Sequence, residues 1–437
     1  MDTKHDRDGD TVKGSVRVGA SGFEPFEVDS PMAKWKNPQP VEFIQKALKE
    51  YSFPNWQSGN EDSIYYNMNF TEIFKCSYVA PAEEPSELER ALDPSLMDLT
   101  FTDHNGTPTP TLREYLGGKR QVQAMMMAHK GKVVFETYPG MKPNGLHVWM
   151  SASKTTVGLL ISMLADEGKI DLDKPMPTYV PELRGTHWEQ ATVRNVMNMS
   201  SGLDIEETIA NLLNPDSWIA HWFTAAFEGK GDWREMSKNA QPLPNEKAGD
   251  HFRYSGANTQ TLVLATEYVS GKRWQDFWNE RVWSKIGAKN PLITGLTPDG
   301  VAAGAGMHNT TPEDMLRYAL IYTPSWHVVA QEQIVSDRLL KSIQTLGNPE
   351  AYRDSTEEQY GIDWFGEKPM TNTAQWDHMF SDGAMFKHGN MGQGIYVDPA
   401  RDFCGMYFGL APNPDSISGI DHSPGYLRTA AKRLAGK

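Results

Sequence analysis

The sequence predicts an α+β fold, because strand-like apolar runs in two distant parts of the chain flank a long stretch of helical patterns. Residues 121–128 and 132–138 are two apolar runs at the spacing of a β-hairpin, with a Lys-Gly turn between them. Near the C-terminus, residues 394–397 and 403–410 read as two further strands. We therefore expect strands from both ends to enclose a helical lobe.

The first part of the chain, residues 1–105, is predicted to be an N-terminal extension packed on a catalytic body formed by residues 106–437. Apolar residues recur at helical spacing over residues 40–53, which predicts a helix that Pro54 ends. The segment that follows is dense in aromatic side chains, which indicates packing against another surface. We expect the extension to shape one wall of the functional site.

Helical patterns occupy the middle and the end of the chain. Residues 218–227, 259–271 and 274–286 are predicted helices. Another helix is expected after Thr311, because this capping hydroxyl is followed by a proline and two acidic residues. A final helix is predicted over residues 423–437.

Composition excludes several classes of protein. Acidic residues exceed basic ones and give a net charge of −14, which argues against nucleic acid or an anionic membrane as a partner. Two cysteines cannot form a disulfide framework. The charged N-terminus has no apolar stretch behind it, and no run of about 18 apolar residues occurs. We therefore expect a cytoplasmic protein, although removal of a leader would leave the same pattern.

A candidate nucleophile, Ser151, precedes Lys154 by three residues at the start of a strongly apolar run. On a helix this spacing places both side chains on one face, close enough to share a proton. A serine hydroxyl needs a base, and lysine can serve once its pKa falls well below about 10.4. The pair also occurs by chance in other proteins, with the lysine as a solvated residue of the first helical turn.

Three further stretches decide between these interpretations. They are residues 252–259, which contain Tyr254, residues 386–399, which contain Lys387-His388-Gly389, and residues 197–204. A Ser-x-x-Lys pair, a tyrosine element and a Lys-x-Gly strand in this order resemble the penicillin-recognising serine hydrolases. From residue 121 onward the chain is similar to the β-lactamase-related serine esterases and amidases. That family includes class C β-lactamases, D-Ala-D-Ala carboxypeptidases and 6-aminohexanoate-dimer hydrolases, and the last are the most similar.

The resemblance implies a serine β-lactamase-like fold and a set of catalytic residues. The fold is a central antiparallel β-sheet flanked by helices, with a helical lobe and the active site between them. Ser151 would be the nucleophile and Lys154 its base, while the phenol of Tyr254 would relay the proton to the leaving group. We expect no cofactor and no metal, because the twelve histidines show no metal-binding spacing.

Substrate-binding residues are also implied by the resemblance. They are Trp149, Asn258, Lys387, His388, Gly389 and Asn390, and His147 is expected beside Trp149 on the pocket wall. The family's Tyr-x-Asn element has Gly256 at its asparagine position here, so Asn258 is either the substrate amide contact or an ordinary helix residue.

The Lys-x-Gly strand has two possible registers. We prefer the register that places glycine at Gly389, because glycine lets a strand approach a substrate closely. The alternative takes His388 as the cation and puts Asn390 where glycine belongs; His388 could also be a surface imidazole on an edge strand.

The leading functional hypothesis is a serine hydrolase that cleaves uncharged or weakly polar carboxylic esters or small amides through an acyl-enzyme on Ser151. The alternatives are a β-lactamase or D-Ala-D-Ala carboxypeptidase, an acyltransferase, and a catalytically silent binding module on the same fold. The expected partner is a small-molecule substrate, and a homodimer is left open. The sequence does not specify the physiological substrate.

Overall fold

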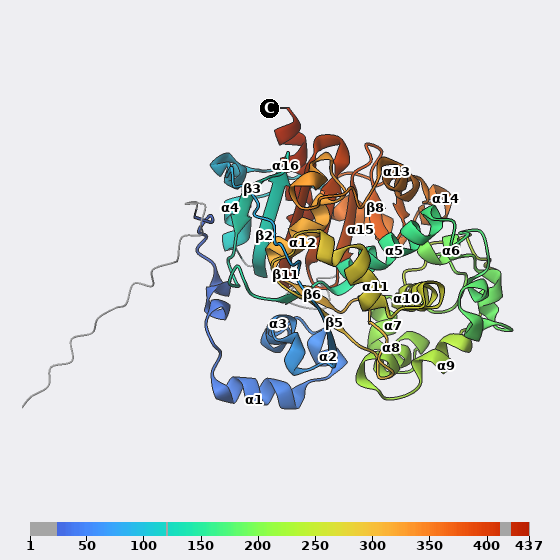
Figure 1. Cartoon of the computed structure of the whole chain (residues 1–437). Coiled ribbons are helices and arrows are strands. Elements are labelled where there is room, and N and C mark those ends of the chain that lie inside the picture. Colours follow the sequence, from blue (N-terminus) through green and yellow to red (C-terminus); the bar gives the residue numbers. More distant parts are fainter. Residues whose placement is uncertain (1–23, 119–120, 411–420, 437) are drawn as a thin grey trace, which may run out of the picture.

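The computed structural model describes residues 24–118, 121–410 and 421–436, and a seven-stranded antiparallel sheet lies at its centre within those residues (Figure 1). The strand order is β3-β2-β11-β10-β9-β8-β7. The strands are β2 (Gln121–His129), β3 (Lys132–Thr137), β7 (Thr371–Thr373), β8 (Trp376–Met379), β9 (Met385–Gly389), β10 (Gln393–Asp398) and β11 (Phe403–Leu410). Because β11 pairs with β2, the two distant strand regions meet in one sheet, and the predicted fold is confirmed.

Both faces of the sheet are covered, since successive side chains of a strand point to opposite faces. On β2, Met127 packs in a core cluster with Tyr426 of α16 (Ser423–Ala435), whereas Met126 belongs to the larger cluster that includes α12 (Pro312–Leu320). All of β11 is buried. The sheet therefore forms the rigid layer between two helical layers.

The helix α5 (Lys154–Asp166) is buried between the sheet and the helical lobe, where it contacts both β8 and α10. The helices of the lobe gather at the right of Figure 1. They are α6 (Val193–Met197), α7 (Ile209–Leu213), α8 (Trp218–Glu228), α9 (Trp233–Lys238), α10 (Gly256–Ser270) and α11 (Trp274–Arg281). The helices α13 (Asp337–Thr345) and α14 (Pro349–Tyr352) pack against β7, and α15 (Thr356–Phe365) packs against β8 and α16.

Several predicted boundaries need correction. The helix α10 begins three residues before the predicted start, because the hydroxyl of Ser255 caps it by accepting the N–H of Ala257. The helix α11 ends earlier than predicted, and a separate 3₁₀ turn (Trp283–Lys285) follows.

The predicted helix over residues 40–53 is also shorter. It is α1 (Val41–Glu50), and Pro54 does not end it but lies inside the next helix, α2 (Phe53–Trp56). Proline is tolerated there because the first N–H groups of a helix have no partner within it. The hydroxyl of Ser52 caps α2 by accepting the N–H of Asn55.

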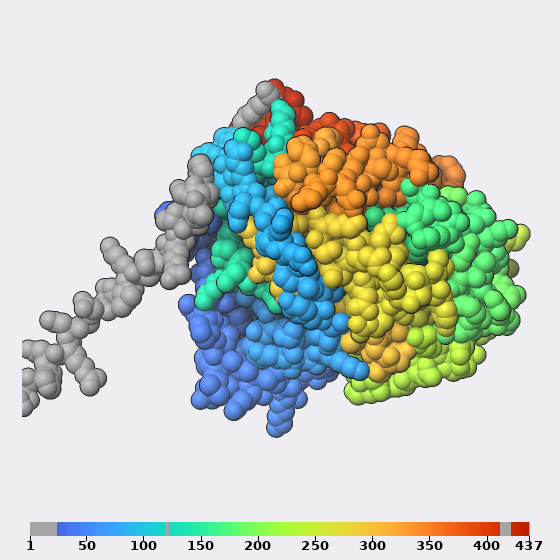
Figure 2. Space-filling view, in the orientation of Figure 1, coloured from blue at the N-terminus to red at the C-terminus, as the bar shows by residue number. Residues whose placement is uncertain are grey.

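The N-terminal segment forms an aromatic core against the rest of the chain. Side chains of α1, α2 and α3 (Glu61–Met68) share one apolar cluster with Met150 and Met307. In Figure 2, blue and light-blue residues of this segment cover the lower left of the visible face and continue upward across it. The first 23 residues of the predicted extension lie outside the described part of the chain, and the division into extension and body stays a prediction.

A second, four-stranded sheet within the described residues joins the same segment to the turn that carries Ser151. Its order is β1-β5-β6-β4. The strands are β1 (Cys76–Val79), β5 (Leu292–Gly295), β6 (His308–Thr310) and β4 (His147–Val148). A further helix, α4 (Leu112–Gly117), precedes β2. No helix in the described ranges combines the length and the apolar character that a membrane crossing requires.

Replacing Trp56 with alanine tests whether the N-terminal segment is part of the folded unit. Trp56 is buried, and its indole N–H donates to Asn67 over 2.8 Å. We expect Trp56→Ala to lower the free energy of unfolding of the main transition by about 3–5 kcal/mol, since a large buried side chain is lost. Val41→Ala, at a side chain that is 63% exposed, is the matched control and should change it by less than about 0.5 kcal/mol. Denaturant titration followed by near-UV circular dichroism measures both; an unchanged main transition in Trp56→Ala would show an independent arm.

Candidate active site

Ser151 lies in a tight turn between the small sheet and α5. The turn is the 3₁₀ helix η4 (Met150–Ser153), which runs directly into α5. Met150 has a φ of 47°, a left-handed conformation that is costly for a side chain of this size. Ser151 is 9% exposed, and its N–H stands at the N-terminal end of η4, where backbone donors have no partner within the helix.

Lys154 contacts Ser151 directly. Its Nζ lies 2.9 Å from Ser151 Oγ and donates to the carbonyl of Ala305 over 2.5 Å, and the side chain is 1% exposed. Burial lowers the pKa of Lys154 to about 8. The carboxylate of Glu207 opposes this shift, and the ammonium of Lys387 adds to it. Part of the amine is therefore neutral near physiological pH, and that neutral fraction can accept a proton.

Tyr254 lies directly before α10 and faces both lysines. Its ring centroid is 5.0 Å from Lys154 Nζ and 4.8 Å from Lys387 Nζ, and its hydroxyl is hydrogen-bonded to Ser151. Burial raises the pKa of Tyr254 well above its usual value, and the charge of Asp377 acts in the same direction. The phenol therefore keeps its proton at neutral pH and can donate it.

Lys387, on β9, completes the cluster from the sheet. Its Nζ donates to Tyr254 Oη over 3.0 Å, to both carboxylate oxygens of Asp377 over 2.7 Å, and to the carbonyl of His388 over 3.0 Å. Asp377 Oδ2 also accepts the N–H of His388 over 2.9 Å. The ammonium of Lys387 is thus buried, and Asp377 on the neighbouring strand β8 neutralises its charge.

Three carboxyl groups beside this cluster were missed by sequence reasoning. They are Glu207, Glu357 and Asp377. Glu207 Oε2 accepts the N–H of Gly256 over 2.7 Å, and burial raises the pKa of Glu207. Burial and the charge of Asp377 raise the pKa of Glu357 well above its usual value, so Glu357 carries a proton and is hydrogen-bonded to Asp377. The one available signal was an acid at position 377 in an otherwise apolar strand-like run.

The predicted register of the Lys-x-Gly strand agrees with the backbone geometry. A Cβ at Gly389 would lie 2.3 Å from the carbonyl oxygen of Trp149, so only glycine fits there. The close approach is to the η4 turn, however, whereas the sequence predicted an approach to the substrate. His388 and Asn390 both line the cavity beside Ser151.

Two other predicted substrate-binding residues lie away from that cavity. Trp149 is fully buried, where its indole N–H donates to Thr310 over 2.7 Å and its ring stacks on Tyr318. Asn258 is fully buried inside α10, with its amide nitrogen 3.7 Å from the sulfur of Met199. His147, expected beside Trp149, is also enclosed. The structure therefore brings none of these side chains to the cavities beside Ser151.

Two cavities meet at Ser151. We call the larger one, of about 300 Å³, the acidic cavity, because its wall includes Glu206, Glu207, Glu357 and Asp377. We call the smaller one, of about 40 Å³, the aromatic cavity. Its apolar wall is formed by Phe53, Trp56, Met150, Phe223, Phe227 and Met307. A molecule bound at Ser151 could thus place an apolar group in the aromatic cavity and a polar or cationic group in the acidic cavity.

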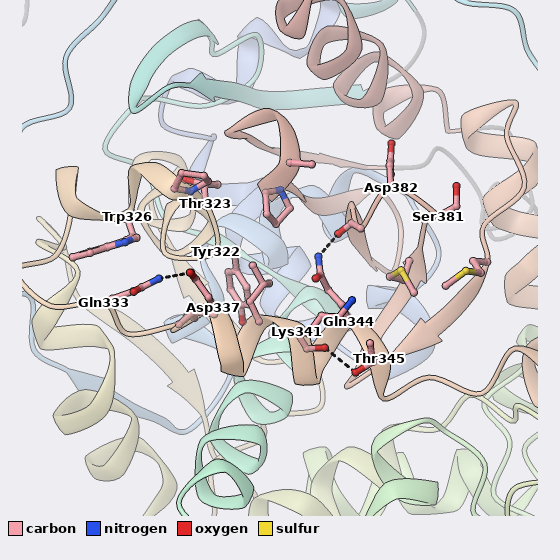
Figure 3. Close-up of a pocket in the computed structure, with 18 residues that line it drawn as sticks. Tyr322, Thr323, Trp326, Gln333, Asp337, Lys341, Gln344, Thr345, Ser381 and Asp382 are labelled. Carbon is pink, nitrogen blue, oxygen red and sulfur yellow. Dashed lines mark hydrogen bonds between the residues drawn. The ribbon is translucent and has the colours of Figure 1, made fainter.

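A further cavity, of about 750 Å³, lies away from Ser151 (Figure 3). It is bounded by α13 and by the turn between β8 and β9, and no residue of the Ser151 cluster lines it. Figure 3 shows Gln333 pointing toward Asp337, to which it donates over 3.0 Å. Asp382, at the other end, is paired with Arg401 and Arg428. We assign this cavity no catalytic role, because no residue of the Ser151 cluster lines it.

Among the described residues, no group of three or more His, Cys, Asp or Glu side chains is arranged to hold a metal ion.

Comparison with known proteins places this geometry in a family. A family model described as Beta-lactamase matches residues 110–415, which contain Ser151, Lys154, Tyr254 and Lys387. The chain belongs to the Beta-lactamase family. The family recognised in the sequence is thereby confirmed.

The individual proteins that this member of the Beta-lactamase family resembles share a quarter or less of its sequence. The 6-aminohexanoate-dimer hydrolase of Paenarthrobacter ureafaciens is 25% identical over 303 residues, which cover 67% of this chain and 74% of the relative. A Bacillus anthracis protein assigned as a 6-aminohexanoate-dimer hydrolase has a solved structure with a TM-score of 0.69 and 21% identity, covering 88% of this chain and 98% of that one. EstCE1, described as a hydrolase with promiscuous acyltransferase activity, gives a TM-score of 0.54 at 14% identity, covering 75% and 96%. These two structures establish the shared fold.

The pH dependence of ester hydrolysis tests Lys154 as the base. Only the neutral amine accepts a proton, so kcat/KM should rise with pH and level off above a midpoint near 8. Glu207→Gln removes a charge that raises this pKa and should move the midpoint to lower pH. The matched control is Glu206→Gln, because Glu206 is not among the main charges acting on Lys154 and should leave the midpoint in place. A profile without any rise between pH 6 and 10 would contradict the assignment.

Proposed function

We propose that this chain is a serine hydrolase that cleaves carboxylic esters or small amides through an acyl-enzyme on Ser151. One observation supports this above all: the Nζ of Lys154 lies 2.9 Å from Ser151 Oγ in a buried site that lowers the pKa of the amine to about 8. Such a pair supplies both an activated nucleophile and its base.

The proposed reaction has two half-steps. Neutral Lys154 takes the proton of Ser151 as the serine oxygen bonds to the substrate carbonyl carbon, which gives a tetrahedral oxyanion. The C–O or C–N bond to the leaving group then breaks, and Tyr254 donates its proton to the departing oxygen or nitrogen while Lys154 returns a proton to the phenol. Water repeats the sequence on the acyl-enzyme, releasing the acid and restoring Ser151.

The oxyanion needs backbone donors, and the N–H of Ser151 is well placed because it lies in the first turn of η4. A second donor is proposed on β9, which runs against η4 at Gly389. The geometry of β9 is fixed there by the contact between Gly389 and the carbonyl of Trp149.

The substrate class follows from the two cavities. Aromatic and methionine side chains favour an apolar acyl group in the aromatic cavity, and the acidic cavity favours a neutral or cationic leaving group. The name of the Paenarthrobacter relative supports the inclusion of a short linear amide. A cytoplasmic location, and a small molecule as the partner in place of nucleic acid or membrane, remain predictions.

Acyl transfer is a second candidate, because the same acyl-enzyme can react with an alcohol or amine in place of water. EstCE1, which shares the fold, is described with that activity. A β-lactamase is less well supported, since the acidic cavity disfavours an anionic antibiotic.

A panel of three substrates tests the proposal. We expect p-nitrophenyl butyrate to have the highest kcat/KM and the neutral amide N-(4-nitrophenyl)butyramide to follow, because a phenolate leaves more readily than an anilide nitrogen. Nitrocefin, which carries a carboxylate, should have the lowest kcat/KM. Ser151→Ala should abolish turnover of all three, and it is the control for background hydrolysis. A nitrocefin value above both others would replace this proposal with a β-lactamase.

A further inference from the structure

Lys387 is a buried ammonium whose hydrogens are all used inside the protein. An ammonium has three donors, and here they reach the carboxylate of Asp377, the phenol of Tyr254 and the carbonyl of His388. The side chains of Lys387 and Asp377 are only 1% and 4% exposed. No donor of this cation is left for an anionic substrate.

The wall of the acidic cavity exposes the carboxylate partner of Lys387 and not Lys387 itself. Asp377 lines that cavity, whereas Lys387 does not. The cavity wall therefore presents carboxyl groups, and the cation behind them is held at 2.7 Å from both oxygens of Asp377. A substrate carboxylate entering this cavity would meet the carboxyl group of Asp377 in front of Lys387 and could not reach the N–H donors of that cation.

We propose that Asp377 is a specificity-determining residue, which excludes substrates with a carboxylate on the leaving-group side by occupying the ammonium of Lys387. This inference rests on the proposed function, because it names the substrate class of the same site. It separates Asp377 from the other acidic residues of the cavity wall. Replacing Glu206 removes a negative charge and leaves its partner Arg253, which does not line the cavity, paired with Glu246. Replacing Asp377 instead releases a buried cation with free donors.

The kinetic test uses two chromogenic esters that differ by one carboxylate. They are p-nitrophenyl butyrate and 3-carboxy-4-nitrophenyl butyrate, both of which release a nitrophenol. We expect the wild-type chain to favour the neutral ester by at least about tenfold in kcat/KM, the scale of one charge-assisted hydrogen bond. Asp377→Asn should reduce this ratio by at least about tenfold. Glu206→Gln, the matched control, should change it by less than about threefold.

A double variant assigns the effect to the released cation. In Asp377→Asn combined with Lys387→Met, no ammonium is available, so the preference for the neutral ester should return toward the wild-type ratio. The proposal is overturned if the wild-type chain hydrolyses both esters equally well, or if Asp377→Asn leaves the ratio unchanged.

A binding test covers the case in which Asp377→Asn folds poorly, because it does not depend on turnover. Asp377→Gly leaves a gap in front of Lys387 that acetate fits. We expect acetate to raise the Tm of Asp377→Gly, with acetamide as the neutral control, and to leave the Tm of the wild-type chain and of Asp377→Gly/Lys387→Met unchanged. Equal effects of acetate on all three would refute the proposal. A positive acetate result without any ester turnover would instead refute the proposed hydrolase function while retaining the anion site behind Asp377.

Discussion

The site depends on the burial of one amine. Lys154 has almost no contact with solvent, and removing an ammonium from water is costly enough to lower its pKa toward neutrality. Its two hydrogen-bond partners, Ser151 and the carbonyl of Ala305, come from different parts of the chain and fix its position. In the proposed mechanism, this burial lets Lys154 act as a base near neutral pH, where an exposed lysine would be almost fully protonated.

The rest of the structure maintains this burial. Strand β9 of the sheet packs against the η4 turn, where Gly389 allows close backbone contact. Lys387, on the same strand, adds a positive charge that further disfavours the ammonium form of Lys154. Asp377 neutralises Lys387, so two lysines can lie on either side of Tyr254 without an unpaired buried charge. The N-terminal segment closes the apolar side of Ser151 through Phe53 and its aromatic neighbours.

Local spacing made part of this predictable. Ser151 and Lys154 are three residues apart, and the Tyr254 and Lys387 elements follow in a recognisable order, so the central residues and the antiparallel sheet could be predicted from the sequence. The partners of Lys387 could not be predicted in this way, because Asp377 lies opposite Lys387 only through the pairing of β8 with β9. Trp149 looked like a pocket residue because it is next to the nucleophile in sequence. The left-handed conformation of Met150 turns the chain at that point, and Trp149 lies in the core.

Covalent labelling with a fluorophosphonate, followed by peptide mass mapping, tests whether Ser151 is the nucleophile and Lys154 its base. Ser153 and Ser255 are the nearby alternatives, but both are fully buried, and their hydroxyls accept the N–H groups of His308 and Ala257. We expect a single adduct on Ser151 in the wild-type chain and labelling slowed by at least about 100-fold in Lys154→Ala. An adduct on Ser153 or Ser255, or undiminished labelling of Lys154→Ala, would contradict this assignment.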